Sequence, residues 1–74
     1  MRVLIHFDGD NTPKGQIQTL YADMTQAQYD ACQAVLSDPA QGDEILYINS
    51  RVKRDGPTKE WMFRASRTRL EIEP

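Results

Sequence analysis

The sequence predicts a small α+β domain of order ββαββ, with one antiparallel four-stranded sheet and a single helix packed on one face. Apolar and polar residues alternate towards both ends of the chain, which is typical of strands that bury one face. A central stretch repeats its apolar residues at helical spacing behind a capping signal. Since 74 residues are enough for only one hydrophobic core, residues 1–74 are expected to form a single domain.

Two strands joined by a polar loop are predicted at the start of the chain. Residues 2–7 alternate so that one face collects the apolar side chains Val3, Ile5 and Phe7. Residues 8–15 are rich in Asp, Gly, Asn and Pro and predict a loop. Residues 16–22 alternate again and predict the return strand of a hairpin. This second strand buries either Ile17 and Tyr21 or Leu20, and the sequence leaves that choice open.

A helix is predicted over residues 26–37. Thr25 and Gln28 have the spacing of a capping box, and Met24 with Tyr29 has the spacing of a hydrophobic staple. Asp38-Pro39 ends the helix, because a residue before proline is disfavoured in the α region. The apolar side expected to pack on the sheet is Ala27, Ala31, Cys32, Val35 and Leu36.

The last two predicted strands are residues 44–52 and the long segment 59–72, which we expect to bend near Ser66. Asp55-Gly56 predicts a two-residue hairpin loop between them. The register that follows gathers the large apolar residues on one face, pairing Leu46 with Ala65, Ile48 with Phe63, and Ser50 with Trp61.

Composition and charge restrict the class of protein. The single Cys32 excludes an internal disulfide and a cysteine-built zinc site. No signal peptide or transmembrane segment is recognisable, so a cytoplasmic location is expected. Residues 1–50 hold two basic and seven acidic residues, a net charge of −5, whereas residues 51–74 hold seven basic and four acidic residues, a net charge of +3. The chain is therefore expected to present one acidic and one basic region.

A short motif, Asp8-Gly9-Asp10-Asn11-Thr12, follows the first strand directly. It resembles the first motif of haloacid-dehalogenase-type phosphatases, in which Asp-x-Asp-x-Thr follows a hydrophobic strand. The resemblance implies Asp8 as a nucleophile, Asp10 as a general acid, and a magnesium ion. That family also needs a parallel sheet, a downstream lysine and a second acidic pair, for which 74 residues leave no room. We therefore interpret the motif as a polar hairpin loop and expect no enzyme, cofactor or metal site.

Two further residues could carry chemistry. His6 is the only histidine, and on that ground a His-based triad and a His-rich metal site are excluded; alternation predicts that it faces solvent opposite the core. Cys32 lies on the apolar side of the predicted helix and is interpreted as a small core residue.

The outer face of the C-terminal hairpin is the candidate binding surface. In the predicted register Tyr47 pairs with Arg64 and Asn49 with Met62, and Leu4 and His6 of the first strand share that face. Tyr, Met and Arg are enriched in protein interfaces. The candidate partner-binding residues are Tyr47, Arg51, Met62, Arg64, Arg67 and Arg69.

Three interpretations of this face compete: a solvated surface in which Arg51 pairs with Glu60, a protein interface, and a nucleic-acid platform with Tyr47 stacked on a base. The acidic net charge argues against the third. We expect a non-enzymatic protein-interaction module, with a homodimer through the long last strand as one form. By analogy of size alone, it is compared with small regulators or inhibitors that bind a host protein, such as phage anti-CRISPR and anti-defence proteins. The alternative is a nucleic-acid-binding regulator that uses the basic C-terminal hairpin.

Overall fold

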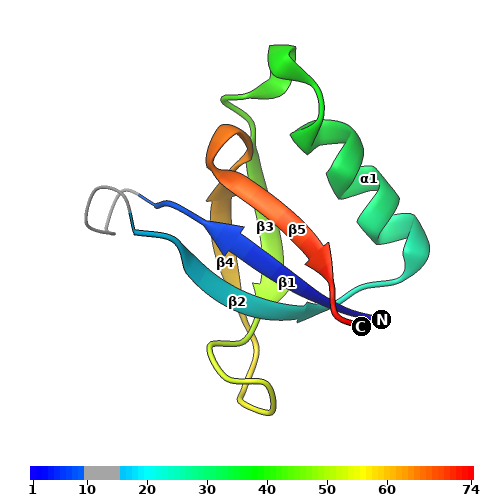
Figure 1. Cartoon of the computed structure of the whole chain (residues 1–74), viewed down its shortest axis with the longest axis vertical. Coiled ribbons are helices and arrows are strands. Elements are labelled where there is room, and N and C mark those ends of the chain that lie inside the picture. The colour runs from blue at the N-terminus through cyan, green and yellow to red at the C-terminus, as the bar shows by residue number, and fades with distance from the viewer. Residues whose placement is uncertain (10–15) are drawn as a thin grey trace.

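The computed structural model describes residues 1–9 and 16–74. Within these residues it contains one α-helix, five strands and two short 3₁₀ helices (Figure 1). In chain order they are β1 (Arg2–Phe7), β2 (Gln18–Asp23), α1 (Gln26–Leu36), η1 (Pro39–Gln41), β3 (Ile45–Ser50), β4 (Lys59–Arg64), η2 (Ala65–Arg67) and β5 (Thr68–Ile72).

The α+β class with one helix is confirmed, but the single four-stranded sheet is wrong. The described strands form two antiparallel sheets, a three-stranded sheet A of order β2-β1-β5 and a two-stranded sheet B of β3 and β4. The expected bend near Ser66 is confirmed, since η2 interrupts the predicted strand 59–72 there. The bend is sharper than expected, so that β4 belongs to sheet B and β5 to sheet A. The turn is held locally, since Thr68 Oγ1 donates to the Arg64 carbonyl over 2.7 Å. The segment 59–72 is therefore two short strands and not one long last strand.

The register of the β3–β4 hairpin is shifted by two residues from the prediction. Leu46 pairs with Phe63, and Tyr47 pairs with Met62. The β3–β4 pairing ends with Ser50 and Lys59, because the backbone of Arg51 bonds to β2 instead. Residues 51–58 therefore form a wider loop than the predicted Asp-Gly turn. An even shift leaves each side chain on its predicted face.

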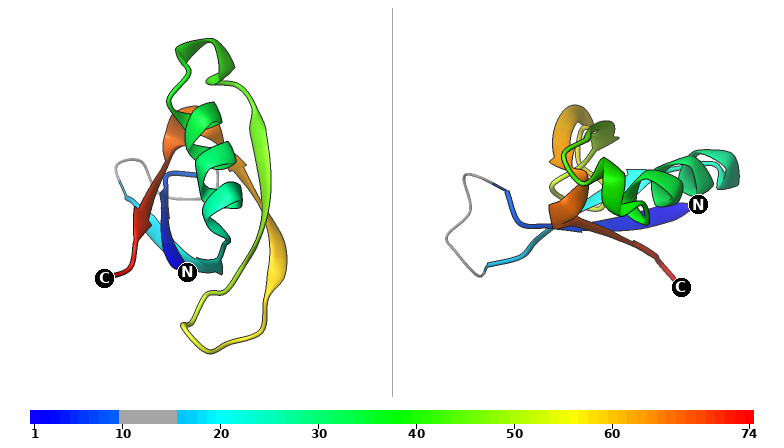
Figure 2. Two further views of the ribbon diagram at one scale, coloured as in Figure 1. Left: turned by 90° about the vertical axis from the view of Figure 1, so that its right-hand side faces the viewer. Right: turned by 90° about the horizontal axis from the view of Figure 1, so that it is seen from above.

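The core lies between the inner faces of the two sheets and α1. Its buried residues come from β1, β2, β4, β5 and the start of the helix segment: Val3, Ile5, Leu20, Ala22, Met24, Phe63 and Leu70. The open question on the second strand is thereby answered, since Leu20 is buried and Ile17 is 71% exposed. Viewed from the helix side, α1 lies over the gap between β5 and β3 (Figure 2).

The capping box of α1 is confirmed in both directions. The Gln28 amide donates to Thr25 Oγ1 over 3.1 Å, and the Thr25 amide donates to Gln28 Oε1 over 2.9 Å. The predicted packing face is wrong in part, because Ala27 and Ala31 are exposed. The helix residues that pack on the core are Tyr29, Cys32 and Leu36.

Cys32 contacts the core as expected, and its burial raises the pKa of the thiol. Among the described residues, no helix is long and apolar enough to cross a membrane.

Candidate interaction site

Three large apolar side chains stand exposed on the outer face of the β3–β4 hairpin. Ile45 is 37% exposed, Tyr47 61% and Met62 70%. Tyr47 pairs directly with Met62, and Ile45 pairs with Arg64, so the four residues form two adjacent cross-strand pairs. We call these four residues the hairpin face. Neighbouring apolar groups on an exposed strand face are more typical of a contact surface than of a solvated one.

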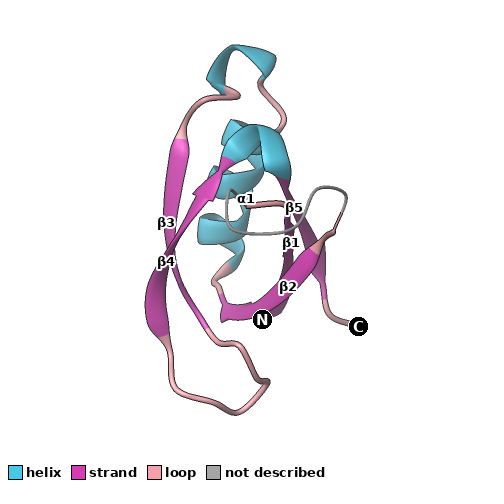
Figure 3. Ribbon diagram, turned by 90° about the vertical axis from the view of Figure 1, so that its left-hand side faces the viewer, coloured by secondary structure: helices cyan, strands magenta, loops and turns pink. Residues whose placement is uncertain are grey.

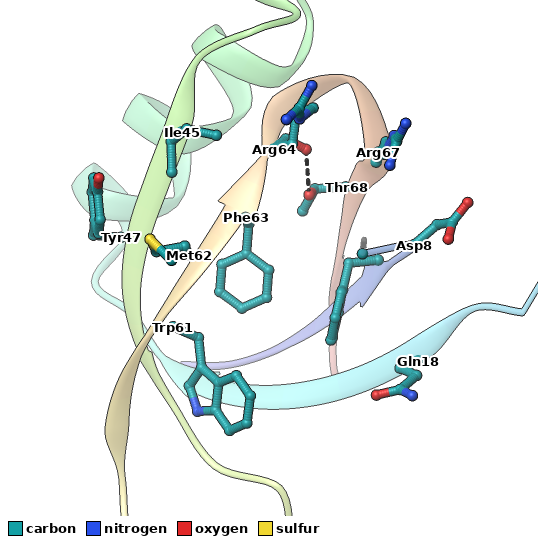
Figure 4. Close-up of a pocket in the computed structure, with 12 residues that line it drawn as sticks. Asp8, Gln18, Ile45, Tyr47, Trp61, Met62, Phe63, Arg64, Arg67 and Thr68 are labelled. Atoms are coloured by element: carbon teal, nitrogen blue, oxygen red, sulfur yellow. Dashed lines mark hydrogen bonds between the residues drawn. The ribbon is translucent and has the colours of Figure 1, made fainter. Parts of the chain in front are cut away.

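A pocket of about 390 Å³ adjoins the hairpin face (Figure 4). We call it the edge pocket. It opens between the hairpin and the end of sheet A, which diverge on the side of the molecule shown in Figure 3. Its lining residues are Phe7, Asp8, Gly9, Gln18, Ile45, Tyr47, Trp61, Met62, Phe63, Arg64, Arg67 and Thr68.

Aromatic rings of the core form the inner wall of the edge pocket. Phe7 and Phe63 meet edge to face, with ring centroids 5.2 Å apart and an interplanar angle of 81°. Trp61 lies on the same face of β4 as Phe63, and Lys59 Nζ lies 4.6 Å from the centroid of its ring. The indole Nε1 of Trp61 is buried and has no hydrogen-bond partner among the described residues.

The edge pocket follows the unpaired edge of β4. Its lining includes four consecutive residues of that strand, Trp61 to Arg64. Successive side chains of a strand point to opposite faces, so one cavity can touch all four only by passing along the strand edge. Within the described residues β4 pairs with β3 alone, which leaves its other edge without a strand partner.

Charged groups stand at one end of the pocket. Arg64 precedes η2, Arg67 is its last residue, and Asp8 follows β1. The Asp8 amide donates to the Arg67 carbonyl over 3.0 Å, which ties the end of β1 to η2. Among the described residues, the lining holds two guanidinium groups and one carboxylate.

The structure brings together four of the six predicted binding residues. Tyr47, Met62, Arg64 and Arg67 all line the edge pocket. The other two lie elsewhere. Arg51 forms an ion pair with Asp23 and donates to the Arg54 carbonyl, so the predicted cross-strand pair of Arg51 with Glu60 is wrong.

Arg69 lies on β5, opposite His6, and lines a separate cavity of about 210 Å³. The inner faces of sheets A and B face each other across the core, so their outer faces point in different directions. The expectation that Leu4 and His6 share the outer face of the hairpin is therefore wrong.

Several basic residues of the C-terminal region are held in ion pairs around the loop 51–58. Arg54 pairs with Glu73, and its guanidinium carbon lies 5.4 Å from the centroid of the Tyr21 ring. Arg2 Nε lies 3.9 Å from Glu73 Oε2, and Arg2 Nη2 lies 4.0 Å from Asp55 Oδ1. These contacts tie the loop to sheet A and to Glu73, and two of the seven basic residues in 51–74, Arg51 and Arg54, pair with carboxylates of the same chain.

His6 has two partners that the sequence did not reveal. Its Nδ1 lies 2.9 Å from Thr19 Oγ1, and its Nε2 lies 2.9 Å from Glu71 Oε1. A hydroxyl, an imidazole and a carboxylate are thus linked in a row, so a single histidine was insufficient ground for excluding a triad-like arrangement. The register of β1 with β2 and β5 would have indicated it. Of the three residues, only His6 lines the neighbouring cavity.

The phosphatase-like motif is described only in part. Asp8 and Gly9 line the edge pocket, whereas Asp10, Asn11 and Thr12 lie outside the described residues. Both described sheets are antiparallel, unlike the parallel sheet that the resemblance implies. In residues 1–9 and 16–74, no group of three or more His, Cys, Asp or Glu side chains is placed to hold a metal ion.

Comparison with protein-family models, with curated proteins and with solved structures finds no match to this chain.

Proposed function

We propose that this chain is a non-enzymatic protein-interaction module that binds its partner through the hairpin face and the edge pocket. The observation that carries the proposal is the contiguity of three exposed apolar side chains, Ile45, Tyr47 and Met62, with an aromatic-walled pocket. Interfaces bury such apolar centres and surround them with polar groups, a part that Arg64 and Arg67 can play here. In residues 1–9 and 16–74, the pocket lining contains one carboxylate and neither histidine nor cysteine, a poor set for acid–base or nucleophilic chemistry.

A protein partner fits better than the alternative, a nucleic acid. Phosphate binding needs several cationic groups facing one surface. Arg2, Arg51 and Arg54 instead face carboxylates of the same chain. The hairpin face is apolar at its centre, and of its three apolar residues only Tyr47 has a ring on which a base could stack.

The finer proposal is that the module is a regulator or inhibitor that covers a site on its partner. A 74-residue chain can mask a surface of the size that specific interfaces use, about 800 Å² on each side. The proposal places this interaction in the cytoplasm, where a lone thiol such as Cys32 stays reduced.

Affinity capture from a bacterial lysate, with and without nuclease, tests the proposal. Capture by the tagged chain is compared with capture by Met62→Glu, which puts a charge at the centre of the hairpin face. Val52→Glu is the matched control, because Val52 is also exposed but does not line the edge pocket. We expect a defined protein that resists nuclease, is retained by Val52→Glu and is lost with Met62→Glu.

Two results would reject the proposal. Equal capture by Met62→Glu and the wild-type chain would show that the hairpin face is not the interface. Recovery that disappears with nuclease, or falls steeply between low and moderate salt, would favour the nucleic-acid alternative.

A further inference from the structure

We propose that the outer part of the hairpin loop, residues 52–58, is a conformational switch that the ion pair of Arg54 with Glu73 holds closed. The loop joins β3 to β4 and projects beyond the strands at one end of the molecule (Figure 1). When the ion pair breaks, the loop detaches from sheet A as a unit while both sheets stay folded. The inference goes beyond the proposed function, because residues 52–58 lie outside the hairpin face and do not line the edge pocket.

Little apart from charge holds the loop in place. None of residues 52–58 is buried, and the apolar side chain of Val52 is 62% exposed. Among the described residues, the one backbone–backbone hydrogen bond of the loop runs from the Gly56 amide to the Lys53 carbonyl, over 3.2 Å. Segments with few buried apolar contacts and exposed backbone groups open at a low cost in free energy. Residues 52–58 meet both conditions.

Both ends of the loop are fixed, which limits how far the opening can spread. Arg51 exchanges two backbone hydrogen bonds with Tyr21, and Ser50 pairs with Lys59. Ser50 is also fully buried. Residues at the ends of elements can act as hinges. Opening therefore stops at Arg51 and Lys59 and leaves the β3–β4 hairpin in register.

Arg54 makes the contacts that close the loop. Its guanidinium pairs with Glu73, and the guanidinium carbon lies 5.4 Å from the centroid of the Tyr21 ring. Its carbonyl accepts a hydrogen bond from Arg51 Nη1 over 3.0 Å. An open loop would therefore free both the Arg54 guanidinium and one face of the Tyr21 ring for another contact.

Of the two ion pairs that reach the loop in the described part of the chain, the one with Glu73 is the latch. Arg2 Nη2 lies 4.0 Å from Asp55 Oδ1, and the Asp55 side chain is 96% exposed, so solvent screens this pair. The Glu73 side chain is only 17% exposed, so its attraction for Arg54 is screened less. Salt still weakens it, because the Debye length falls from about 10 Å at 0.1 M to about 3 Å at 1 M. The switch should therefore respond to ionic strength.

Limited trypsin digestion of the folded chain tests the inference, because Lys53 and Arg54 are cleavage sites within the loop. When opening is fast, the rate of cleavage after Lys53 follows the population of the open loop. Glu73→Gln keeps the shape of the side chain but removes its charge, and we expect it to speed this cleavage about two- to fivefold at about 0.1 M salt. Raising the salt to about 1 M should speed cleavage of the wild type by a similar factor and change Glu73→Gln little. Each rate is divided by that of an unstructured peptide of the same loop sequence, which removes the effect of salt on trypsin itself.

Two variants control for other effects. Glu71→Gln makes the same change two residues earlier, where the carboxylate contacts His6, and should leave cleavage after Lys53 unchanged. Arg54→Gln removes the other half of the ion pair and should be cleaved at least as fast as Glu73→Gln. Adding Glu73→Gln to Arg54→Gln should have no further effect, since both changes remove the same interaction.

Two results would overturn the inference. Equal cleavage of Glu73→Gln and the wild type at low salt would show that Glu73 does not hold the loop. A cleavage rate that rises with low urea as steeply as the unfolding equilibrium would show that trypsin acts on the unfolded chain, because global unfolding exposes far more surface than local opening. The local switch predicts a rate of cleavage after Lys53 that low urea barely changes.

Discussion

Tyr21 and Arg51 exchange two backbone hydrogen bonds, and their pairing is the isolated β-bridge described between the two sheets. The Tyr21 amide donates to the Arg51 carbonyl over 2.9 Å, and the Arg51 amide donates to the Tyr21 carbonyl over 2.7 Å. The Arg51 side chain then pairs with Asp23, two residues further along β2. This junction anchors one end of the β3–β4 hairpin on sheet A. The hairpin in turn forms one side of the edge pocket.

The ion pair of Arg51 with Asp23 should stabilise the fold modestly. The Asp23 side chain is 54% exposed and that of Arg51 18%, so solvent screens the pair in part. A double-mutant cycle of Arg51→Ala and Asp23→Ala, measured by urea unfolding, should give a coupling free energy of about 0.5–1 kcal/mol. Lys53→Ala with Asp23→Ala serves as the uncoupled control. A coupling near zero for Arg51 and Asp23 would show that the backbone bridge alone holds the junction.

The capping box of α1 should contribute to stability without affecting binding. Thr25→Ala removes the acceptor for the Gln28 amide and should lower the free energy of unfolding by about 1 kcal/mol. Gln28→Ala removes the reciprocal bond to the Thr25 amide and should cost less, because alanine has a higher helix propensity than glutamine. Chemical denaturation measures both. Partner capture should be unchanged in each variant, and its loss would mean that α1 takes part in the interface.

Local signals in the sequence predicted the elements well, whereas long-range pairing could not be predicted. The capping box depends on Thr25 and Gln28, three residues apart, and the alternation in β1 follows from Val3, Ile5 and Phe7. The break between β4 and β5 falls on Ala65-Ser66-Arg67, which contains neither glycine nor proline. It is held by distant groups, including the bond from the Ser66 amide to the Gly42 carbonyl. No local pattern signals such a contact.

The same distinction applies to the candidate site. Tyr47 and Met62 could be placed on the outer face from alternation alone, and an even shift of register preserved that placement. The sequence could not show that Arg51 is engaged by Asp23, because that pairing depends on how β3 meets β2. The edge pocket was missed for a related reason. It lies beside β4 where η2 turns the chain towards sheet A, and that turn depends on long-range contacts.

Asp38 should make the η1 turn sensitive to acid. Hydrogen bonds from the Gln41 side chain and the Ala40 amide lower the pKa of the Asp38 carboxyl. A lowered pKa in the folded state means that the ionised form is stabilised. Its contribution is present above the unfolded pKa, about 3.9, and is lost as the pH falls through the folded value. Unfolding free energies measured from pH 6 to pH 2 should therefore fall less steeply at the acid end for Asp38→Asn than for the wild type. Identical slopes would contradict this role, and Asp30→Asn is the control on the exposed side of α1.

Phe63 should be indispensable to the fold, although it lines the edge pocket. It is 2% exposed and contacts Phe7 edge to face. Replacing a buried phenylalanine by alanine costs about 3–5 kcal/mol, which matches the whole net stability of about 3–5 kcal/mol expected of so small a core. Phe63→Ala should therefore be largely unfolded at 25 °C by circular dichroism. Phe7→Ala, which alters a less buried ring of the same pair, should stay folded and unfold at lower denaturant.

If Phe63→Ala unfolded cooperatively at a denaturant concentration close to the wild-type midpoint, the fold would not depend on this part of the pocket wall. The expected outcome has the opposite consequence. The inner wall of the edge pocket would then be core and binding surface together, so loss of binding in a Phe63 variant would reflect unfolding. Only the exposed residues, Tyr47 and Met62 above all, can then distinguish loss of the interface from loss of the fold.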